Sequence, residues 1–415
     1  SEKKCTSVEL CDILNRLGGV MYFQALDDKG ECVGVYKDGG LYFEELPENL
    51  KRTWKYAEFL GNLDVEYANL YAPNRSLADV CPDYLLDRWS DVETRLKAFY
   101  RSFVLAKVNM NENCFFDLVP QQFLLEYCEI RNKITQHVFE NYEKPQNYDF
   151  LVDLTKVLTR IGHQKLNIDV SSLNDKAHLP KYRQAMQKYA QIDPYCRYVI
   201  DGTKTGRLTT QKNSFPAMTM DKDFRSIVKP TNDWFIELDF NAAEIRTLMA
   251  LGGSVMPQED IHTWNACNLF GEGTTREKAK LDFFSWLYDE KKNNPSLSKV
   301  YDRDKVRKMY FDGQVVKTMF GREIEAEQRT ALNYIIQSTT ADLVLRQVIK
   351  IHDMLRDKKS FIAFTIHDNI VLDLATEERY IIPRLIEEFS DTALGKYLVN
   401  VKAGKDFGNL KELNL

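Results

Sequence analysis

Several features that would quickly assign a class are missing from this sequence. None of its eight cysteines lies in a CxxC pair, which argues against a zinc site or a disulfide framework and favours reduced thiols. No uninterrupted apolar run reaches the ~18 residues that a membrane span needs, and there is no internal repeat or low-complexity tract. We therefore expect a soluble intracellular protein with no membrane partner.

An excess of positive charge is missing as well. The chain has 56 Lys and Arg against 61 Asp and Glu, a formal net charge of −5, so bulk electrostatics does not indicate a nucleic-acid partner. A protein of this composition that binds nucleic acid must segregate its charges. What is present is core-forming material, 44% hydrophobic and 12% aromatic over 415 residues, which predicts a folded protein of two to four structural units.

The patterning changes along the chain. Two short β-prone runs within residues 20–36 are separated by Asp27-Asp28-Lys29-Gly30, which predicts a hairpin. Apolar residues then recur at spacings of three and four over residues 119–190, which predicts long amphipathic helices. From about Asp201 strands and helices alternate and the loops carry polar clusters, so we expect the chemistry in this half.

The first candidate catalytic acid is Asp239. Residues 234–240 are typical of a strand with this acid at its C-terminal end. A helix is expected to follow, with Asn241 as its N-cap and Glu244 as the capping-box partner. A carboxylate between a strand end and a helix start is well placed to hold a hard cation, although a solvated acid would give the same pattern.

The second candidate is Asp368, between two β-prone runs at residues 361–366 and 370–372. His367-Asp368-Asn369 predicts a tight hairpin turn, because Asp and Asn tolerate positive φ. A plain hairpin would explain this segment alone. Together with Asp239, however, the acid indicates phosphoryl transfer, in which two metal ions ~3.5–4 Å apart are bridged by carboxylates.

A third segment predicts a phosphate-binding helix. Thr274 and Glu277 form a second expected capping box. Four residues then follow at intervals of four: Arg276, Lys280, Phe284 and Tyr288. Cations near the helix start would meet phosphates and the aromatic rings would meet sugar and base. A solvated basic edge with two core aromatics is the plainer alternative.

These segments together resemble the family A DNA polymerases, the DNA polymerase I family. Residues 239–246 are similar to motif A, the Arg276–Tyr288 series to motif B, and His367-Asp368-Asn369 to motif C, usually His-Asp-Glu. The order of the remaining matches along the chain is also that of the family. They are Thr205-Gly206-Arg207-Leu208-Thr209, Asp260-Ile261-His262-Thr263, the series Arg329, Asn333 and Gln337 followed by Ala341-Asp342, and the closing segment 401–407.

The resemblance implies roles for individual residues. Asp239 and Asp368 would be the catalytic metal ligands for two Mg²⁺ ions, with Mn²⁺ as a substitute. The implied nucleotide-binding residues are Glu244, the steric gate against a 2′-hydroxyl, and His262, Arg276, Lys280, Phe284 and Tyr288. The implied DNA-binding residues are Thr205, Arg207, Arg329, Asn333, Gln337 and His367.

The resemblance also implies an α+β right-hand fold, with an antiparallel palm sheet, helical fingers, a helical thumb and a small N-terminal α/β region. We expect the thumb at 106–195, the palm at 196–255 and 319–415, and the fingers at 256–318. Residues 1–105 would be a reduced exonuclease remnant or a module for a replication accessory protein. Primer–template DNA and dNTPs would be the partners, in the cytoplasm of a bacterial or phage-infected cell.

The sequence departs from the family pattern at three positions: Asn369 replaces the usual Glu, Ala242 the usual Gln, and Asp289 the usual Gly. The segment after motif B also looks short, and no proofreading domain is evident, since Asp64-Val65-Glu66 has the D-x-E form but no room for one. Two alternatives stay open. One is a single-subunit RNA polymerase, and the other is a catalytically silent primer–template binding protein.

Overall fold

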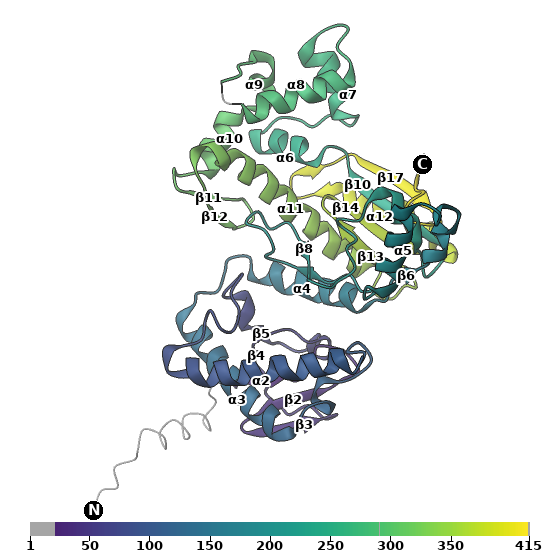
Figure 1. The fold of residues 1–415 in the computed structure, drawn as a ribbon. Helices are drawn as coiled ribbons and strands as arrows, with labels where there is room; N and C mark the ends of the chain where they lie inside the picture. Colours follow the sequence, from purple (N-terminus) through teal and green to yellow (C-terminus); the bar gives the residue numbers. More distant parts are fainter. Residues whose placement is uncertain (1–20, 290, 414–415) are drawn as a thin grey trace, which may run out of the picture. The chain divides into compact units, whose positions relative to one another are not determined.

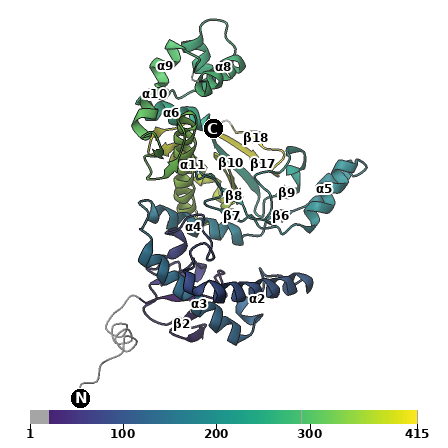
Figure 2. The ribbon, with the colours of Figure 1, turned by 60° about the vertical axis from the view of Figure 1, so that its left-hand side comes forward.

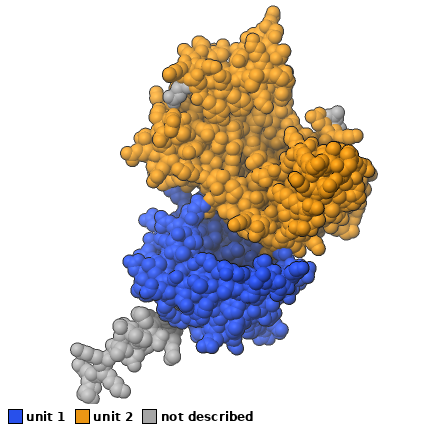
Figure 3. Space-filling model, in the orientation of Figure 1, with its two compact units in different colours: residues 1–159 blue, residues 160–415 orange. Residues whose placement is uncertain are grey.

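The computed structural model describes residues 21–289 and 291–413 (Figure 1). The chain divides into two compact units, residues 1–159 and 160–415, coloured separately in Figure 3. The boundary falls within the segment 106–195. None of the described helices combines the length and apolar character that a membrane crossing requires.

Unit 1 combines small sheets with long helices. The predicted hairpin is confirmed: β1 pairs antiparallel with β2, Phe23 opposite Lys37, and a third strand, β3, extends the sheet. The elements are β1 (Phe23–Ala25), β2 (Gly34–Lys37), β3 (Gly40–Phe43), β4 (Arg52–Thr53), β5 (Glu66–Tyr67), α2 (Leu86–Leu105), α3 (Gln121–Asn141) and α4 (Tyr148–His163), which runs on into unit 2.

The helices of unit 1 follow the predicted apolar spacing. In α3, Phe123, Ile130, Ile134 and Val138 are all buried in one apolar cluster, because side chains three and four residues apart share a helix face. The D-x-E segment has ordinary ion pairs: Asp64 is exposed beside Lys51, and Glu66 is held by Arg52 at 2.8 Å.

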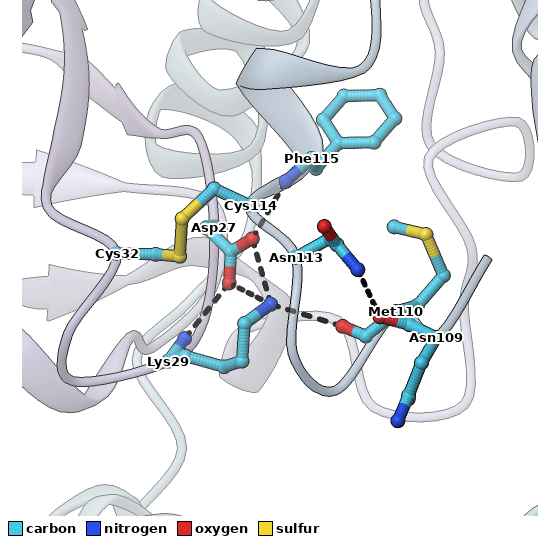
Figure 4. Close-up of a disulfide and its surroundings, with 8 residues drawn as sticks. All are labelled: Asp27, Lys29, Cys32, Asn109, Met110, Asn113, Cys114 and Phe115. Carbon is cyan, nitrogen blue, oxygen red and sulfur yellow. Dashed lines mark hydrogen bonds and ion pairs between the residues drawn. A yellow bond between two sulfur atoms is a disulfide. The ribbon is translucent and has the colours of Figure 1, made fainter.

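The expectation of reduced thiols is wrong at one place. Cys32 and Cys114 form a disulfide, with their Cα atoms 5.7 Å apart (Figure 4). Beside it the Asp27 carboxylate accepts hydrogen bonds from the backbone N–H of Phe115 at 2.9 Å and of Lys29 at 3.0 Å. The sequence could not show this pair, because its members are 82 residues apart and only the packed fold brings them together.

We expect Cys32→Ser/Cys114→Ser to lower the free energy of unfolding of unit 1 by about 2–4 kcal/mol, because the cross-link restricts the unfolded chain. Denaturant unfolding with and without reductant measures this effect. Cys267→Ser removes an exposed free thiol and should leave the midpoint unchanged. Equal midpoints for the double variant and the wild-type protein would contradict the prediction.

Unit 2 holds the predicted strands and helices of the second half. The β elements are β6 (Asn167–Ile168), β7 (Tyr198–Val199), β8 (Thr209–Thr210), β9 (Val228–Lys229), β10 (Trp234–Phe240), β11 (Val315–Lys317), β12 (Glu323–Glu325), β13 (Phe361–Ile366), β14 (Asn369–Leu374), β15 (Asp391–Thr392), β16 (Gly395–Lys396), β17 (Val399–Gly404) and β18 (Lys411–Glu412). The helices are α5 (Pro180–Gln191), α6 (Ala243–Gly252), α7 (Ile261–Asn265), α8 (Arg276–Tyr288), α9 (Pro295–Tyr301), α10 (Arg303–Tyr310), α11 (Gln328–Met354) and α12 (Ile382–Ser390).

A five-stranded sheet in the order β13-β14-β10-β17-β18 forms the centre of unit 2, and all its pairings are antiparallel. Side chains alternate between its faces. On one face Phe240 stacks on Phe389 of α12, with ring centroids 4.3 Å apart. Figure 2 shows α11 beside the same sheet. Residues of β10 at odd positions, including Asp239, therefore lie on the opposite face.

The start of α6 differs from the prediction. Its N-cap is Ala242, in a left-handed conformation with φ 49°, and no side chain caps the helix. Asn241 is engaged elsewhere, because its Oδ1 accepts a hydrogen bond from Arg246 at 3.1 Å and its Nδ2 donates to Asp260 at 3.1 Å. Tertiary hydrogen bonds have taken the side chain that local patterning assigned to the cap.

Arg246 itself is fully buried. Its guanidinium donates to the backbone carbonyl oxygens of Asn241 at 2.7 Å, Pro257 at 2.6 Å and Glu259 at 2.6 Å. A buried charge is tolerated when its donors are satisfied in this way. The arginine therefore joins the end of β10, the helix α6 and the segment before α7.

Candidate active site at the end of the central sheet

Asp239 lies near the C-terminal end of β10, which is the central strand of the sheet. Its backbone is opposite Asn369 of β14 on one side and Asn400 of β17 on the other. Asn400 Nδ2 donates to its Oδ2 at 3.4 Å. Burial, with the nearby charges of Glu237 and Asp368, raises the pKa of Asp239 to about 6 against the hydrogen bond from Asn400 and the charge of Lys402. The carboxylate thus has too little positive charge around it.

Asp368 lies in the tight turn that joins β13 to β14. The hairpin prediction is confirmed, but the positive φ belongs to His367, at 51°, rather than to the Asp or Asn. Burial raises the pKa of Asp368, and the charges of Arg207 and His367 act in the opposite direction. Asp368 is next to Asn369, the cross-strand partner of Asp239, and the two acids interact electrostatically. The structure therefore brings the two predicted acids together.

Three further polar side chains surround this pair on the same sheet face. Glu237, two residues before Asp239, is 6% exposed. Its Oε1 forms an ion pair with Lys402 Nζ at 2.7 Å, and its Oε2 accepts a hydrogen bond from Asn369 Nδ2 at 3.4 Å. Asn369 Oδ1 is buried and has no hydrogen-bond partner. One face of the sheet thus carries a connected polar cluster.

The cluster suits a hard divalent cation. Carboxylate and amide oxygens are the ligands that Mg²⁺ prefers, and Mg²⁺ is commonly held by only one or two carboxylates together with substrate phosphates. Asp239 and Asp368 provide two carboxylates whose pKa burial raises despite the cations nearby, and Asn369 provides an unpartnered buried oxygen. Within the described residues no three acids, histidines or cysteines gather at one metal position, so any third protein ligand here would be neutral.

The predicted phosphate-binding helix is α8, and its cap is one residue later than expected. Thr275, not Thr274, accepts the capping hydrogen bond from the backbone N–H of Lys278. Arg276 forms a two-pronged ion pair with Asp260, through Nε and Nη2 at 2.9 Å each. Burial opposes ionisation of Asp260, but hydrogen bonds from Arg276, Asn241 and Thr263 hold its pKa well below the usual range.

The aromatic residues of the Arg276–Tyr288 series follow on from His262. Its ring lies 6.2 Å from that of Phe284, which stacks on Tyr288 at 6.1 Å. Burial lowers the pKa of His262 to about 4, and the charges of Lys280 and Arg276 add to this against that of Asp260. The histidine is therefore neutral near pH 7 and stands beside two cations and an aromatic pair.

Glu244 connects this helix to the acids. It forms an ion pair with Arg207 and interacts with the hydroxyl of Tyr288. Burial, opposed by Arg207, raises the pKa of Glu244, and the charge of Asp368 contributes to the rise. Glu244 is therefore not a capping-box partner. It stands between the two-acid end of the sheet and the aromatic end of α8.

The loop that carries Arg207 rests on a buried ion pair. Thr205 is buried, and Gly206 has φ 78° and lies so close to Arg322 that a Cβ there would meet the guanidinium at 2.5 Å. Arg322 in turn donates to both carboxylate oxygens of Asp342 in α11, at 2.8 and 3.2 Å. The position of Arg207 thus depends on a glycine and on a charge pair beneath it.

The remaining predicted DNA-binding residues lie at the start of α11 and in the turn. Arg329 is exposed and pairs with Glu327 at 2.8 Å. Asn333 and Gln337 follow at intervals of four and are half-buried, while His367 is exposed. Residues at this spacing share one face of the helix. Arg329, Asn333 and Gln337 therefore form one row on α11, and His367 lies apart from them in the turn beside Asp368.

Sequence reasoning missed Glu237, Lys402, Asn400 and the Arg322–Asp342 pair. A signal existed for the first: an acid two residues before Asp239 in an otherwise apolar strand must share its face. The others depend on which strand lies beside β10 and on packing beneath a loop. Neither the strand order nor this packing can be predicted from a local sequence pattern.

Three comparisons with known proteins all find similarity to DNA polymerases of the DNA polymerase I type. Residues 304–409 match the model of DNA polymerase family A. The chain is 22% identical to DNA polymerase I of Caldicellulosiruptor bescii, in an alignment that covers 71% of this chain and 45% of that protein. It is 25% identical to the thermostable DNA polymerase I of Thermus aquaticus, in an alignment that covers 52% of this chain and 33% of that protein. It therefore spans less than half of these relatives. The POL domain of Pol1 from M. smegmatis, in complex with DNA primer-template and dNTP, shares the fold with TM-score 0.61, 12% identity and coverage of 97% and 99%.

Proposed function

We propose that this chain is a member of DNA polymerase family A, whose model matches residues 304–409, and that it is a DNA-directed DNA polymerase that adds dNTPs to a primer 3′ end. The observation that carries the proposal is the meeting of Asp239 and Asp368 at one end of the sheet. Two half-buried acids that repel each other are costly, and such arrangements concentrate at functional sites.

Asp239 and Asp368 would hold two Mg²⁺ ions, or Mn²⁺ in their place. When bound, such a pair lowers the pKa of an attacking hydroxyl and neutralises charge on the leaving oxygen. The contribution of this chain is to fix the acids: Asn400 orients Asp239, and the turn at His367 sets Asp368 beside Asn369.

The triphosphate would bind to Arg276, Lys280 and His262, near the N-terminus of α8, where cations and the helix dipole favour anions. Arg276 is held by Asp260 in the free chain, so a phosphate must compete with that carboxylate. Phe284 would lie by the incoming sugar, and Tyr288 would mark the template side.

The DNA would contact Arg207 through the minor groove, whose acceptors are common to all base pairs. Thr205 is buried in the same loop, so it would support this contact rather than make one. Arg329, Asn333 and Gln337 form one face of α11 for the same duplex, and His367 lies at the turn beside Asp368. A mildly acidic protein can bind DNA in this way because the contacts are local.

In the terms of the family, the five-stranded sheet would be the palm at 196–255 and 319–415. The helices around α8 would be the fingers at 256–318, and residues 106–195 the thumb. Residues 1–105 would be a reduced exonuclease remnant or a module for a replication accessory protein.

Extension of a labelled primer on a DNA template, with dNTPs or rNTPs and either Mg²⁺ or Mn²⁺, tests the proposal. Extension with dNTPs supports it. A preference for rNTPs would instead indicate a single-subunit RNA polymerase, and DNA binding without extension under all conditions would indicate a catalytically silent binding protein. Either result overturns the assignment.

Glu244→Ala should raise the incorporation of rNTP relative to dNTP by about 10–100-fold. The side chain would close the space that a 2′-hydroxyl needs, and its removal opens that space. Single-nucleotide insertion kinetics measure the ratio. Glu323→Ala, an exposed acid on β12 paired with Lys317, is the matched control and should leave the ratio unchanged, while an unchanged ratio in Glu244→Ala would refute the gate.

A further inference from the structure

The polar face of the central sheet offers two acids, which together fill only part of the coordination shell of a divalent cation. Asp239 and Asp368 meet there, and among the described residues no third acid, histidine or cysteine joins them at one metal position. Mg²⁺ is held in near-octahedral geometry by oxygen atoms. Either water and phosphates supply the remaining oxygens, or a neutral protein group does.

Asn369 carries the oxygen in question. It is the direct cross-strand partner of Asp239 and the sequence neighbour of Asp368, and its Oδ1 is buried with no hydrogen-bond partner. A buried polar atom without a partner is unfavourable, because its desolvation is not compensated by a hydrogen bond. Such a cost at the centre of a candidate active site points to a ligand that is bound there during function.

The orientation of this amide is set by Glu237. An amide nitrogen can only donate, and a carboxylate can only accept. Because Asn369 Nδ2 faces Glu237 Oε2 at 3.4 Å, the amide oxygen is on the other branch. The reversed amide would place its oxygen against the carboxylate, so Glu237 selects one of the two arrangements.

Glu237 is fixed in its turn by Lys402. The two residues are cross-strand partners in β10 and β17, and Lys402 Nζ lies 2.7 Å from Glu237 Oε1. The Glu237 side chain is only 8% exposed, and a buried acid of this kind is retained when it is paired. Three strands therefore contribute one connected row: Lys402, Glu237 and Asn369.

We propose that Asn369 Oδ1 is the third protein ligand of the divalent cation at Asp239 and Asp368, and that Glu237 and Lys402 are positioning residues that aim it. The inference rests on the proposed function, because it concerns the same site. Second-layer partners of this kind orient ligands, and their loss lowers metal affinity about 10–100-fold. Glu237 thereby supports a metal site without being a ligand in it.

Mn²⁺ binding to the full chain, followed by the electron paramagnetic resonance signal of free Mn²⁺, tests this without any turnover. Glu237→Leu/Lys402→Met removes one charge of each sign, so the net charge of the site stays the same. We expect affinity for Mn²⁺ to fall about tenfold. Glu237→Gln/Lys402→Met keeps an acceptor for Asn369 Nδ2 and should bind within about twofold of the wild-type protein.

A double-mutant cycle separates aiming from other effects. In an Asn369→Ala background, Glu237→Leu/Lys402→Met should cause no further loss, because its target is gone. A further tenfold loss, or full affinity in Glu237→Leu/Lys402→Met alone, overturns the proposal. Thermal unfolding identifies a variant that fails to fold, and Asn369→Leu, which changes no charge and has a similar size, then tests the ligand directly: full affinity overturns the proposal and about tenfold loss supports it.

The result is distinguishable from a failure of the proposed function. Asp239→Asn should lose both Mn²⁺ binding and primer extension, and retention of both would reject the polymerase site itself. If Asp239→Asn loses both while the Glu237 and Asn369 variants bind normally, only this inference is rejected. Glu323→Gln, a distant exposed acid, is the control for a general loss of negative charge.

Discussion

Asp239→Asn and Asp368→Asn should each reduce primer extension by at least about 10³-fold. Each change removes a carboxylate that would hold the divalent ions, and a loss of about 4 kcal/mol of transition-state stabilisation corresponds to that factor. Single-turnover extension kinetics measure the loss. DNA affinity should change little, because neither acid carries a favourable contact to a phosphate.

Asp239→Asn should also make the metal-free protein more stable. The pKa of Asp239 is raised to about 6, foremost by burial, so its ionised form is disfavoured in the folded state near pH 7. A raised pKa of an acid means that stability falls as the pH rises from about 4 through 6. Asp239→Asn removes that charge and should recover of order 2 kcal/mol in the absence of metal.

Loss of activity with a gain in thermal stability is therefore the expected signature at Asp239, and no general folding defect produces it. Asp357→Asn, in the exposed turn after α11, is the matched control and should change neither quantity. If Asp239→Asn extended primers at more than a tenth of the wild-type rate, the acid would have no central role in the chemistry.

Arg322→Met should lower the free energy of unfolding of unit 2 by about 3–5 kcal/mol, because it leaves a buried charge without its main partner. Asp342 is fully buried in α11, and Arg322 holds both of its oxygens. Burial already raises the pKa of Asp342 against the charge of Arg322. The loss should therefore become smaller at low pH, where the carboxyl group is protonated.

The double variant Arg322→Met/Asp342→Leu supplies the control. Replacing both partners by apolar groups is often near neutral, so most of the lost stability should return in denaturant unfolding. Activity should not return with it, because Gly206 packs directly on the Arg322 guanidinium and Arg207 follows in the same loop. Equal extension by the double variant and the wild-type protein would show that the loop does not need this support.

Local patterns predicted the elements on which the site is built. The sequence predicts a strand at 234–240, and β10 lies at Trp234–Phe240; it also predicts the hairpin around Asp368 and a helix capped at Thr274, which begins one residue later. Alternation and helical spacing are properties of a short window, so they survive folding. The meeting of the two acids followed only from resemblance.

The failures have one cause, which is competition from distant parts of the chain. Asn241 has the chemistry of an N-cap, yet Arg246 and Asp260 hold it in the folded chain. Cys32 and Cys114 have no telling spacing, yet the fold of unit 1 joins them. Lys402 reaches Glu237 only because β17 lies beside β10. Tertiary contacts of this kind cannot be read from a single local pattern.

The buried Arg246 restricts where the region around α8 can bend. If its hydrogen bonds to the carbonyls of residues 241, 257 and 259 were broken, a buried cation would lose its partners, which is strongly unfavourable. The backbone has room instead at Gly271 and Gly273, both at positive φ with open space around them. We therefore expect any movement of α8 to pivot at these glycines. The ion pair between Arg276 and Asp260 would have to break before α8 could move.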